Sequence, residues 1–225
     1  MRRWRMPGSS EEGRGADPGT VARWVAGWVV SRGVRAPVPF HDGVHIEVGL
    51  PQQKARYVFS RPRAELIRSL VDGVTEPWVY LKLCAPYAAA APLFPEPWRV
   101  EDAGFLMGTE IGTTARPLGL SDGYVLSLEL RDGVTIATVA TETGEPAAQG
   151  RLVVTEGTAV FDQIETRELH RRRGLGGSVM NALARDAAAR GARQGLLVAT
   201  HLGHALYTSL GWRVLSPYTS AVIPG

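Results

Sequence analysis

The chain has 225 residues, of which 25 are Lys or Arg and 22 are Asp or Glu, and its formal net charge is +3. This length allows one large domain or two small ones with a buried core. The small basic excess does not indicate a nucleic-acid-binding protein. The single cysteine, Cys84, excludes an internal disulfide framework and is typical of a reducing compartment, so we expect a cytoplasmic protein.

The first 18 residues carry several arginines but no apolar segment of signal-peptide length. We therefore expect residues 1–18 to form a disordered tail. Residues 21–32 predict a helix in which Trp24 and Trp28 lie one turn apart. This segment contains Arg23 and is too short to cross a bilayer, so we expect it to pack on the domain and expect no membrane partner.

Apolar alternation and the positions of Gly and Pro divide the next part of the chain into short elements. The predicted elements are strands at 43–49, 55–60 and 78–84, a helix at 62–73, a short alanine-rich segment at 85–94 and a further strand within 95–108. The apolar run VYLKLCA contains Cys84, and we expect a buried, unreactive thiol there.

From residue 121 onward the pattern is that of an antiparallel meander. Four predicted strands are separated by the turn signals RDG, TGEP and TEGT. A helix follows, with Leu175, Val179 and Leu183 on one face and a stop at Gly191. The compact strand QGLLVAT, the short helix HLGHALYTSLGW and a last strand complete the chain.

The two parts of the sequence share a weak internal repeat. A strand, a short helix and a strand ending in Trp-Arg-Val occur at residues 78–100 and again at 195–214. The repeat predicts that residues of about 40–110 are a degenerate copy of the later domain. The copy has SRPRAELI where the later segment has RRRGLGGS, so it lacks glycines that would admit a phosphate. We therefore expect only the C-terminal domain to bind such a ligand.

The stretch ELHRRRGLGG, residues 168–177, combines three arginines and three glycines at the start of the predicted helix. A helix N-terminus offers unpaired N–H groups and a positive dipole end, so this stretch predicts a phosphate site. A P-loop is excluded because no lysine follows Gly177. A dinucleotide-binding fold is disfavoured because Val179 occupies the third glycine position and the strand ahead belongs to a meander.

The spacing Arg171-x-x-Gly174-x-Gly176, followed one strand later by ALYTSLGW, resembles the GNAT superfamily of acyl-CoA-dependent N-acetyltransferases. The resemblance covers residues of about 121–221. It implies an α+β fold with a mixed, mostly antiparallel sheet flanked by helices. Family members often have a proline and an acidic residue before the loop, where this chain has Glu168 and Leu169.

The resemblance also implies a cosubstrate, acetyl-CoA, and the residues that bind it. The pyrophosphate would lie on backbone N–H groups of the glycine loop, and the pantetheine arm would lie between the strand before the loop and the strand after the helix. The implied cosubstrate-binding residues are Ile164, Thr166, Arg171, Arg172, Arg173, Gly174, Gly176 and Gly177. For the three arginines alone, a solvated charged turn is the alternative interpretation.

Catalysis on a thioester needs a base for the amine and a proton donor for the thiolate. Tyr207 occupies the position of the family's general acid, with a packed core tyrosine as the alternative. If strict alternation places Val160, Asp162, Ile164 and Thr166 on one face, Asp162 is the candidate base, with a surface carboxylate as the alternative. His201 and His204 follow the next strand, where capping or solvent-exposed histidines are the more common case.

These observations predict three segments: a tail at 1–18, an N-terminal α/β domain at 19–110 and a GNAT-like catalytic domain at 111–225. The predicted activity is transfer of an acetyl or short acyl group to a primary amine of a small molecule, without a metal and without a nucleic-acid partner. Protein or peptide N-acetylation and a non-catalytic acyl-CoA sensor remain alternatives. The acceptor and the oligomeric state do not follow from the sequence.

Overall fold

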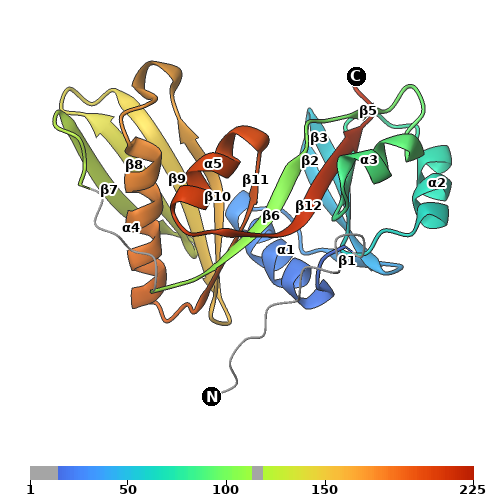
Figure 1. Cartoon of the computed structure of the whole chain (residues 1–225), viewed down its shortest axis with the longest axis horizontal. Coiled ribbons are helices and arrows are strands. Elements are labelled where there is room, and N and C mark those ends of the chain that lie inside the picture. The colour runs from blue at the N-terminus through green and yellow to red at the C-terminus, as the bar shows by residue number, and fades with distance from the viewer. Residues whose placement is uncertain (1–14, 113–118) are drawn as a thin grey trace.

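The computed structural model describes residues 15–112 and 119–225. Its strands form one mixed sheet with helices on both faces (Figure 1). Residues 1–14 of the predicted tail lie outside the described residues, whereas Asp17 and Pro18 belong to the start of a helix. None of the described helices is long and apolar enough to cross a membrane.

The N-terminal region combines short strands with helices. They are α1 (Pro18–Arg32), β1 (Val38–Phe40), β2 (Gly43–Leu50), β3 (Gln53–Phe59), α2 (Ala64–Gly73), β4 (Val79–Leu83), α3 (Tyr87–Ala90), β5 (Arg99–Val100) and β6 (Gly104–Glu110). The predicted helices and strands of this region are confirmed. The one strand predicted within 95–108 is two strands, β5 and β6, and β1 was not predicted.

The second region contains the predicted meander and the elements that follow it. They are β7 (Tyr124–Arg131), β8 (Val134–Thr141), β9 (Pro146–Thr155), β10 (Thr158–Thr166), α4 (Leu175–Ala189), β11 (Gln194–Ala199), α5 (His201–Ser209) and β12 (Arg213–Val222). A single turn of 3₁₀ helix, Glu168–His170, lies between β10 and α4.

The strand order is β1-β2-β3-β4-β12-β6-β11-β10-β9-β8-β7. The pairs β3–β4 and β10–β11 are parallel, and the other pairs among the described strands are antiparallel. Each parallel pair is joined by a helix, α2 or α4. The same strand–helix–strand connectivity therefore occurs in both regions, within 53–83 and 158–199, whereas the repeat seen in the sequence covers the segments that follow, 78–100 and 195–214.

Strands β6 and β12 connect the two regions, because each of them pairs with a strand of the other region. β6 pairs with β11 along its whole length and so lies inside the sheet of the second region. β12 pairs with β6 through residues up to Tyr218, and its last residues, Thr219–Val222, pair with β4 of the first region. The predicted domain boundary near residue 110 thus falls within one continuous sheet, and the independence of the two parts stays a prediction.

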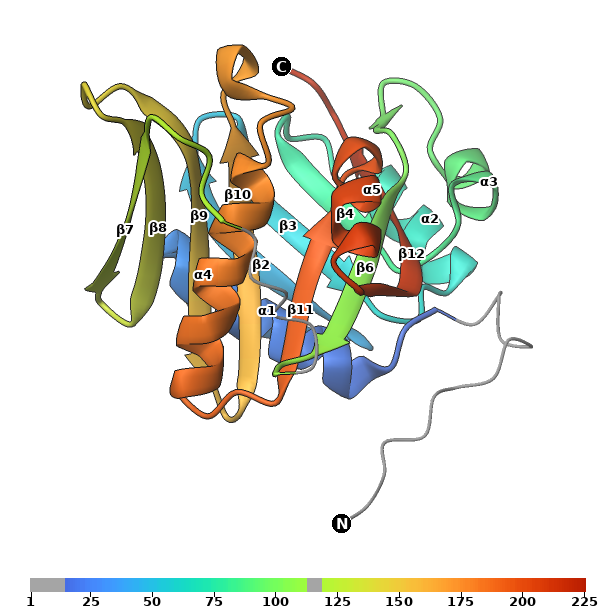
Figure 2. The same ribbon diagram turned by 60° about the vertical axis from the view of Figure 1, so that its left-hand side comes forward.

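The helices α1 and α4 cover opposite faces of β9 and β10 (Figure 2). Val160 packs among residues of α1, whereas its neighbour Phe161 packs with α4. A Cβ on Gly27 of α1 would lie 2.4 Å from a methyl carbon of Val160, so the glycine permits the close approach of this helix to the sheet. On the N-terminal region, α2 and α3 pack on the face opposite to α1.

Candidate functional site

Strands β10 and β11 part in the middle of the sheet. Residues Thr158–Val160 of β10 pair with residues 194–196 of β11. The pairing ends there, although β10 continues to Thr166 and β11 to Ala199. From Phe161 to Thr166 the edge of β10 that faces β11 therefore has no strand partner among the described residues. A free strand edge presents N–H and C=O groups that can pair with an extended ligand.

A bulge interrupts β10 at this opening. The pairing of β10 with β9 shifts between Asp162 and Glu165, and Gln163 has φ of 52°. Phe161 and Ile164 consequently both pack in the core under α4, whereas Asp162 faces α1. The predicted grouping of Val160, Asp162, Ile164 and Thr166 on one face is therefore wrong, because a bulge breaks the period of two.

The loop after β10 presents backbone N–H groups at the start of α4. Arg172 and Gly174 have φ of 63° and 75°, and left-handed residues in such a turn arrange N–H groups around a concave site. The N-cap residue of α4 is Gly174, which has no side chain to occupy the N–H groups of the first turn. The first N–H that bonds back into the helix is that of Ser178, so the N–H groups of its first turn remain available to an anion.

Gly176 lies where the loop, β10 and α5 meet. A Cβ on this residue would be 3.2 Å from Cδ2 of Leu206 and 3.4 Å from Oγ1 of Thr166. The glycine thus keeps the first turn of α4 narrow beside the end of β10. Of the predicted cosubstrate residues, the structure brings together Thr166, Arg171 and Gly176, whereas the Ile164 side chain belongs to the core.

The three arginines of the loop have different surroundings. Arg171 donates from Nε to the carbonyl oxygen of Thr166 at 3.3 Å, and Arg173 donates from Nη1 to the hydroxyl of Tyr124 at 2.9 Å. Tyr124 is also 2.9 Å from Nδ1 of the buried His170. The Arg172 side chain is exposed and has no partner among the described residues. Arg172 is therefore the loop side chain that is free to bind an anion.

Tyr207 lies on α5 with its ring in the core and its hydroxyl without a hydrogen bond to a described residue. The residue is 7% exposed, and its ring centroid is 6.2 Å from that of Trp212. Burial and the negative charge of Asp162 raise the pKa of Tyr207 to about 12. The phenol thus keeps its proton at neutral pH and can act as a hydrogen-bond donor.

Asp162 is held in an ion pair on the α1 side of the sheet. Its Oδ2 accepts from Nε of Arg32 at 2.6 Å and from the hydroxyl of Ser31 at 2.9 Å, and its Oδ1 accepts from Nη2 of Arg32 at 3.0 Å. Taking the proton of an attacking amine would require breaking this bidentate pair. The geometry does not favour the predicted role of Asp162 as a base.

The two histidines and the cysteine fit structural roles. His201 is exposed at the start of α5, and the ring of His204 stacks on Phe105 at 4.4 Å. Cys84 is fully buried, and this burial raises the pKa of its thiol to about 12. The expectation of a buried thiol is confirmed.

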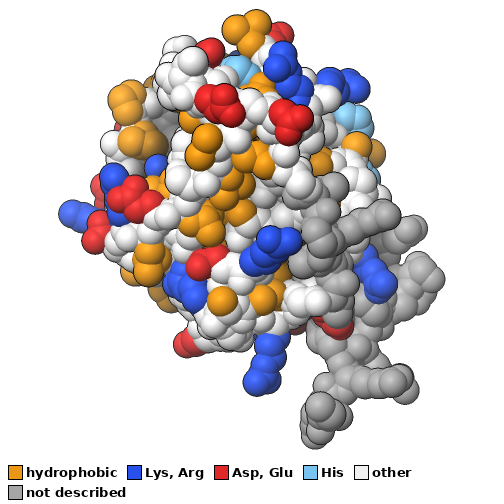
Figure 3. Space-filling view, turned by 90° about the vertical axis from the view of Figure 1, so that its left-hand side faces the viewer, with side chains coloured by type: hydrophobic (Ala, Val, Ile, Leu, Met, Phe, Trp, Pro, Cys, Tyr) orange, Lys and Arg blue, Asp and Glu red, His pale blue; other side chains and the backbone are white. Residues whose placement is uncertain are grey.

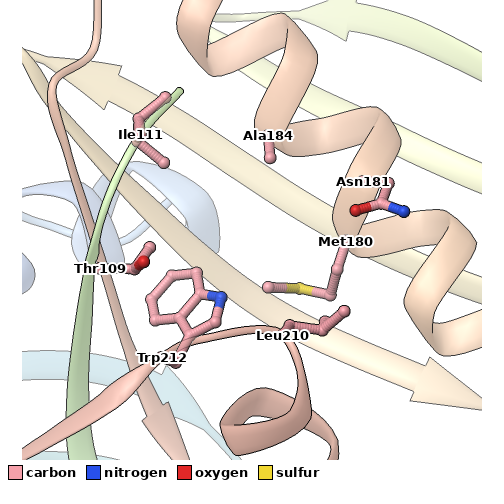
Figure 4. A pocket seen from close by; sticks show the side chains of 7 residues that line it. All are labelled: Thr109, Ile111, Met180, Asn181, Ala184, Leu210 and Trp212. Carbon is pink, nitrogen blue, oxygen red and sulfur yellow. The ribbon is translucent and has the colours of Figure 1, made fainter. Parts of the chain in front are cut away.

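Two cavities lie beside α4, away from the opening between β10 and β11. One, of about 10 Å³, is formed by side chains of α4, the end of β6 and the α5–β12 turn, including Met180 and Trp212 (Figure 4). Another, of about 330 Å³, lies between α4 and β7 and is lined by Leu120, Leu126 and Ala182 among others. Figure 3 shows this side of the molecule, where apolar side chains gather at the centre. None of the predicted site residues lines either cavity.

Comparisons with known proteins agree with this architecture. Residues 140–220 match the family model described as FR47-like protein. A GCN5-related N-acetyltransferase from Kribbella flavida is 14% identical, with 91% of this chain and 95% of that chain covered and a TM-score of 0.66. The fold is that of the GNAT superfamily. The expectation drawn from the arginine and glycine spacing is therefore confirmed for the fold.

Two further solved structures show the same GNAT fold. A GCN5-related N-acetyltransferase from Sphaerobacter thermophilus is 12% identical, covers 94% of this chain and 95% of its own, and has a TM-score of 0.60. A tandem GNAT protein from the clavulanic acid biosynthesis pathway is 13% identical, covers 82% of this chain and 80% of its own, and has a TM-score of 0.53. No curated protein matches the sequence.

Sequence reasoning missed Arg32 and Gln163 as parts of the site. Arg32 is 130 positions from Asp162, and no local pattern indicates that pair. Gln163 occupies the bulge, where its buried Oε1 has no hydrogen-bond partner among the described residues. A positive φ at a glutamine has no signal in a single sequence.

Proposed function

We propose that the chain is an acyl-CoA-dependent N-acyltransferase that transfers an acetyl or other short acyl group to a primary amine of a small molecule. The observation that supports this proposal best is the parting of β10 from β11 directly beside the glycine-rich start of α4, in a GNAT fold. We further propose that the reaction takes place in the cytoplasm.

The backbone of the loop would hold the coenzyme phosphates. The N–H groups of residues 172–177 and the free Arg172 side chain supply hydrogen-bond donors and positive charge. The exposed edge of β10 between Phe161 and Thr166 offers groups that can pair with the amides of a pantetheine arm. The thioester supplies an activated acyl group when the cosubstrate is bound.

Tyr207 would donate a proton or hydrogen bond to the departing thiolate. Its phenol is protonated at neutral pH because its pKa is raised to about 12, chiefly by burial. Gly203, one turn earlier on α5, leaves room for the ring, since a Cβ there would be 3.0 Å from Cε2 of Tyr207. The packed ring fixes the position of the phenol, which supports the role of a general acid.

Asp162 would hold α1 and β10 in place and would not act as a base. Its pair with Arg32 ties the end of α1 to β10 at the point where β10 parts from β11. Its negative charge also contributes to the raised pKa of Tyr207. We therefore assign Asp162 a positioning role, in place of the role predicted from alternation.

The proposal is tested by two measurements on the full chain. Unfolding temperature is measured with and without acetyl-CoA, because a ligand selective for the native state must stabilise it. Release of coenzyme thiol is then followed with a panel of small amines, and the N-acyl product is identified by its mass. Stabilisation with transfer supports an enzyme of small amines, stabilisation with transfer only to peptides supports the alternative acceptor, and stabilisation without transfer supports a sensor.

A further inference from the structure

Arg56 is a buried cation without an acidic partner. It lies on β3 and is 5% exposed, and its side chain makes no ion pair or hydrogen bond with a described residue. Its Nε is sealed from solvent and has no hydrogen-bond partner in the part of the chain that the structure describes. Burial lowers the pKa of Arg56 to about 10, which leaves the guanidinium charged at neutral pH. A buried, unpaired charge is costly, so its retention calls for a compensating group.

The neighbours of Arg56 supply an aromatic face and further donors. The guanidinium carbon lies 3.7 Å from the ring centroid of Trp28 on α1. Tyr218 on β12 is buried, and its hydroxyl has no hydrogen-bond partner among residues 15–112 and 119–225. Its charge would raise the pKa of Arg56 if the phenol were ionised. Lys82 on β4 is also buried; this burial, and to a smaller extent the charge of Arg56, lowers the pKa of Lys82 to about 8. This group, Arg56, Lys82 and Tyr218, is named the cationic cluster below.

The acidic residues near the cationic cluster do not neutralise Arg56. Asp162 is engaged by Arg32 and Ser31. Glu101 lies 3.5 Å from Nζ of Lys82, which also donates to the hydroxyl of Ser220 at 2.9 Å. The cluster thus contains one more buried positive charge than the described carboxylates balance. Two of its donors, Nε of Arg56 and the hydroxyl of Tyr218, have no acceptor among the residues that the structure describes.

A short chain of contacts connects the cluster to the opening between β10 and β11. Arg56 and Arg32 both lie over the ring of Trp28, Arg32 at 5.5 Å from its centroid. Arg32 in turn pairs with Asp162, at the position where β10 leaves β11. The cluster therefore lies on the α1 face of the sheet, opposite to α4.

We propose that the cationic cluster binds a carboxylate of the acceptor, so that the substrates are amines that also carry a carboxylate, such as free amino acids. This inference rests on the proposed function. A carboxylate supplies the missing negative charge and accepts hydrogen bonds from the planar guanidinium and from the tyrosine hydroxyl. Arg56 is then a specificity-determining residue, and Lys82 adds positive charge.

A purely structural role for Arg56 makes a different prediction about stability. If the stacking on Trp28 were its purpose, Arg56→Met would destabilise the fold. If the role of Arg56 is to bind a ligand, Arg56→Met removes an unpaired buried charge, and the unfolding temperature stays unchanged or rises. The side chain of Met is of similar length and can fill the space beside the indole.

The test uses matched pairs of amino acids and their amides, for example phenylalanine with phenylalaninamide and glutamine with glutaminamide. Unfolding temperature of the full chain is measured with each compound, with and without coenzyme A, and acetyl transfer is measured with each as acceptor. The variants are Arg56→Met and, as a matched control, Arg35→Met, whose side chain is 84% exposed.

We expect at least one amino acid to stabilise the wild-type chain and its amide to do so about ten- to a hundredfold more weakly, in keeping with the loss of a charged hydrogen-bond partner. The preference should vanish in Arg56→Met and persist in Arg35→Met. Equal effects of acid and amide, or no stabilisation by any acid, overturn the inference. Failure of acetyl-CoA to bind overturns the proposed function instead, and because the binding arm needs no acetyl-CoA, the two failures are distinguishable.

Discussion

The replacement Asp162→Asn separates a positioning role from a role as catalytic base. The substitution keeps the shape of the side chain and removes the charge that holds Arg32. The side chains of Asp162 and Arg32 are only 12% and 28% exposed, so screening by solvent is incomplete. With three hydrogen bonds to the carboxylate affected, we expect a loss of about 2 kcal/mol in the free energy of unfolding.

For a chain of this size, such a loss lowers the unfolding temperature by about 4–8 °C. The assay is thermal unfolding of wild type, Asp162→Asn, Arg32→Met and the double variant, whose coupling energy isolates the pair. Glu47→Gln is the control, because its partner Arg35 is 84% exposed and the expected change is within about 0.5 kcal/mol. An unchanged unfolding temperature in Asp162→Asn, together with a loss of turnover greater than about a hundredfold, would refute this reasoning and restore Asp162 as the base.

The remaining predictions concern Tyr207 and Lys82. Tyr207→Phe keeps the ring in the core, so coenzyme affinity measured by calorimetry should persist while kcat falls by ~10²- to 10⁴-fold; full activity would exclude the general-acid role. Burial lowers the pKa of Lys82 from 10.5 to about 8, so the unfolded chain binds more protons than the folded chain between these pH values, and stability gains from this residue as pH rises through that window. Lys82→Met should accordingly be more stable than wild type below pH 8, because the variant has no buried charge. This advantage in unfolding free energy should shrink by on the order of 3 kcal/mol as the pH rises to 10.5. An advantage that is constant with pH would contradict the prediction.

The elements of the fold follow from local patterns that one sequence contains. The meander was predicted because strand alternation and turn signals such as RDG are local, and the helix from Leu175 because its apolar residues recur at helical spacing. The spacing of Arg171, Gly174 and Gly176 indicated the loop because close approach to phosphate demands glycine there. These features survive in the structure because no distant contact is needed to specify them.

The features that sequence reasoning missed depend on contacts between distant segments. The exchange of β6 and β12 is set by which strands finally pair, and neither strand differs in pattern from an ordinary buried strand. The bulge at Gln163 redirects Ile164 and leaves Asp162 facing α1, although the apolar alternation on either side is regular. In the sequence, Arg56 is one polar residue of a predicted strand. Only the packing of α1 and β12 makes it a buried charge.

The most direct test of coenzyme binding at the start of α4 is a calorimetric titration of wild type and Gly176→Val with acetyl-CoA. Any side chain at Gly176 approaches Leu206 and Thr166 and fills the space beside the loop. Gly73→Val is the control, because nothing lies within 4 Å of a Cβ there. We expect one binding site per chain in wild type and in Gly73→Val, and no binding in Gly176→Val. No binding to the wild-type chain, two equivalent sites, or unchanged affinity in Gly176→Val would contradict the account.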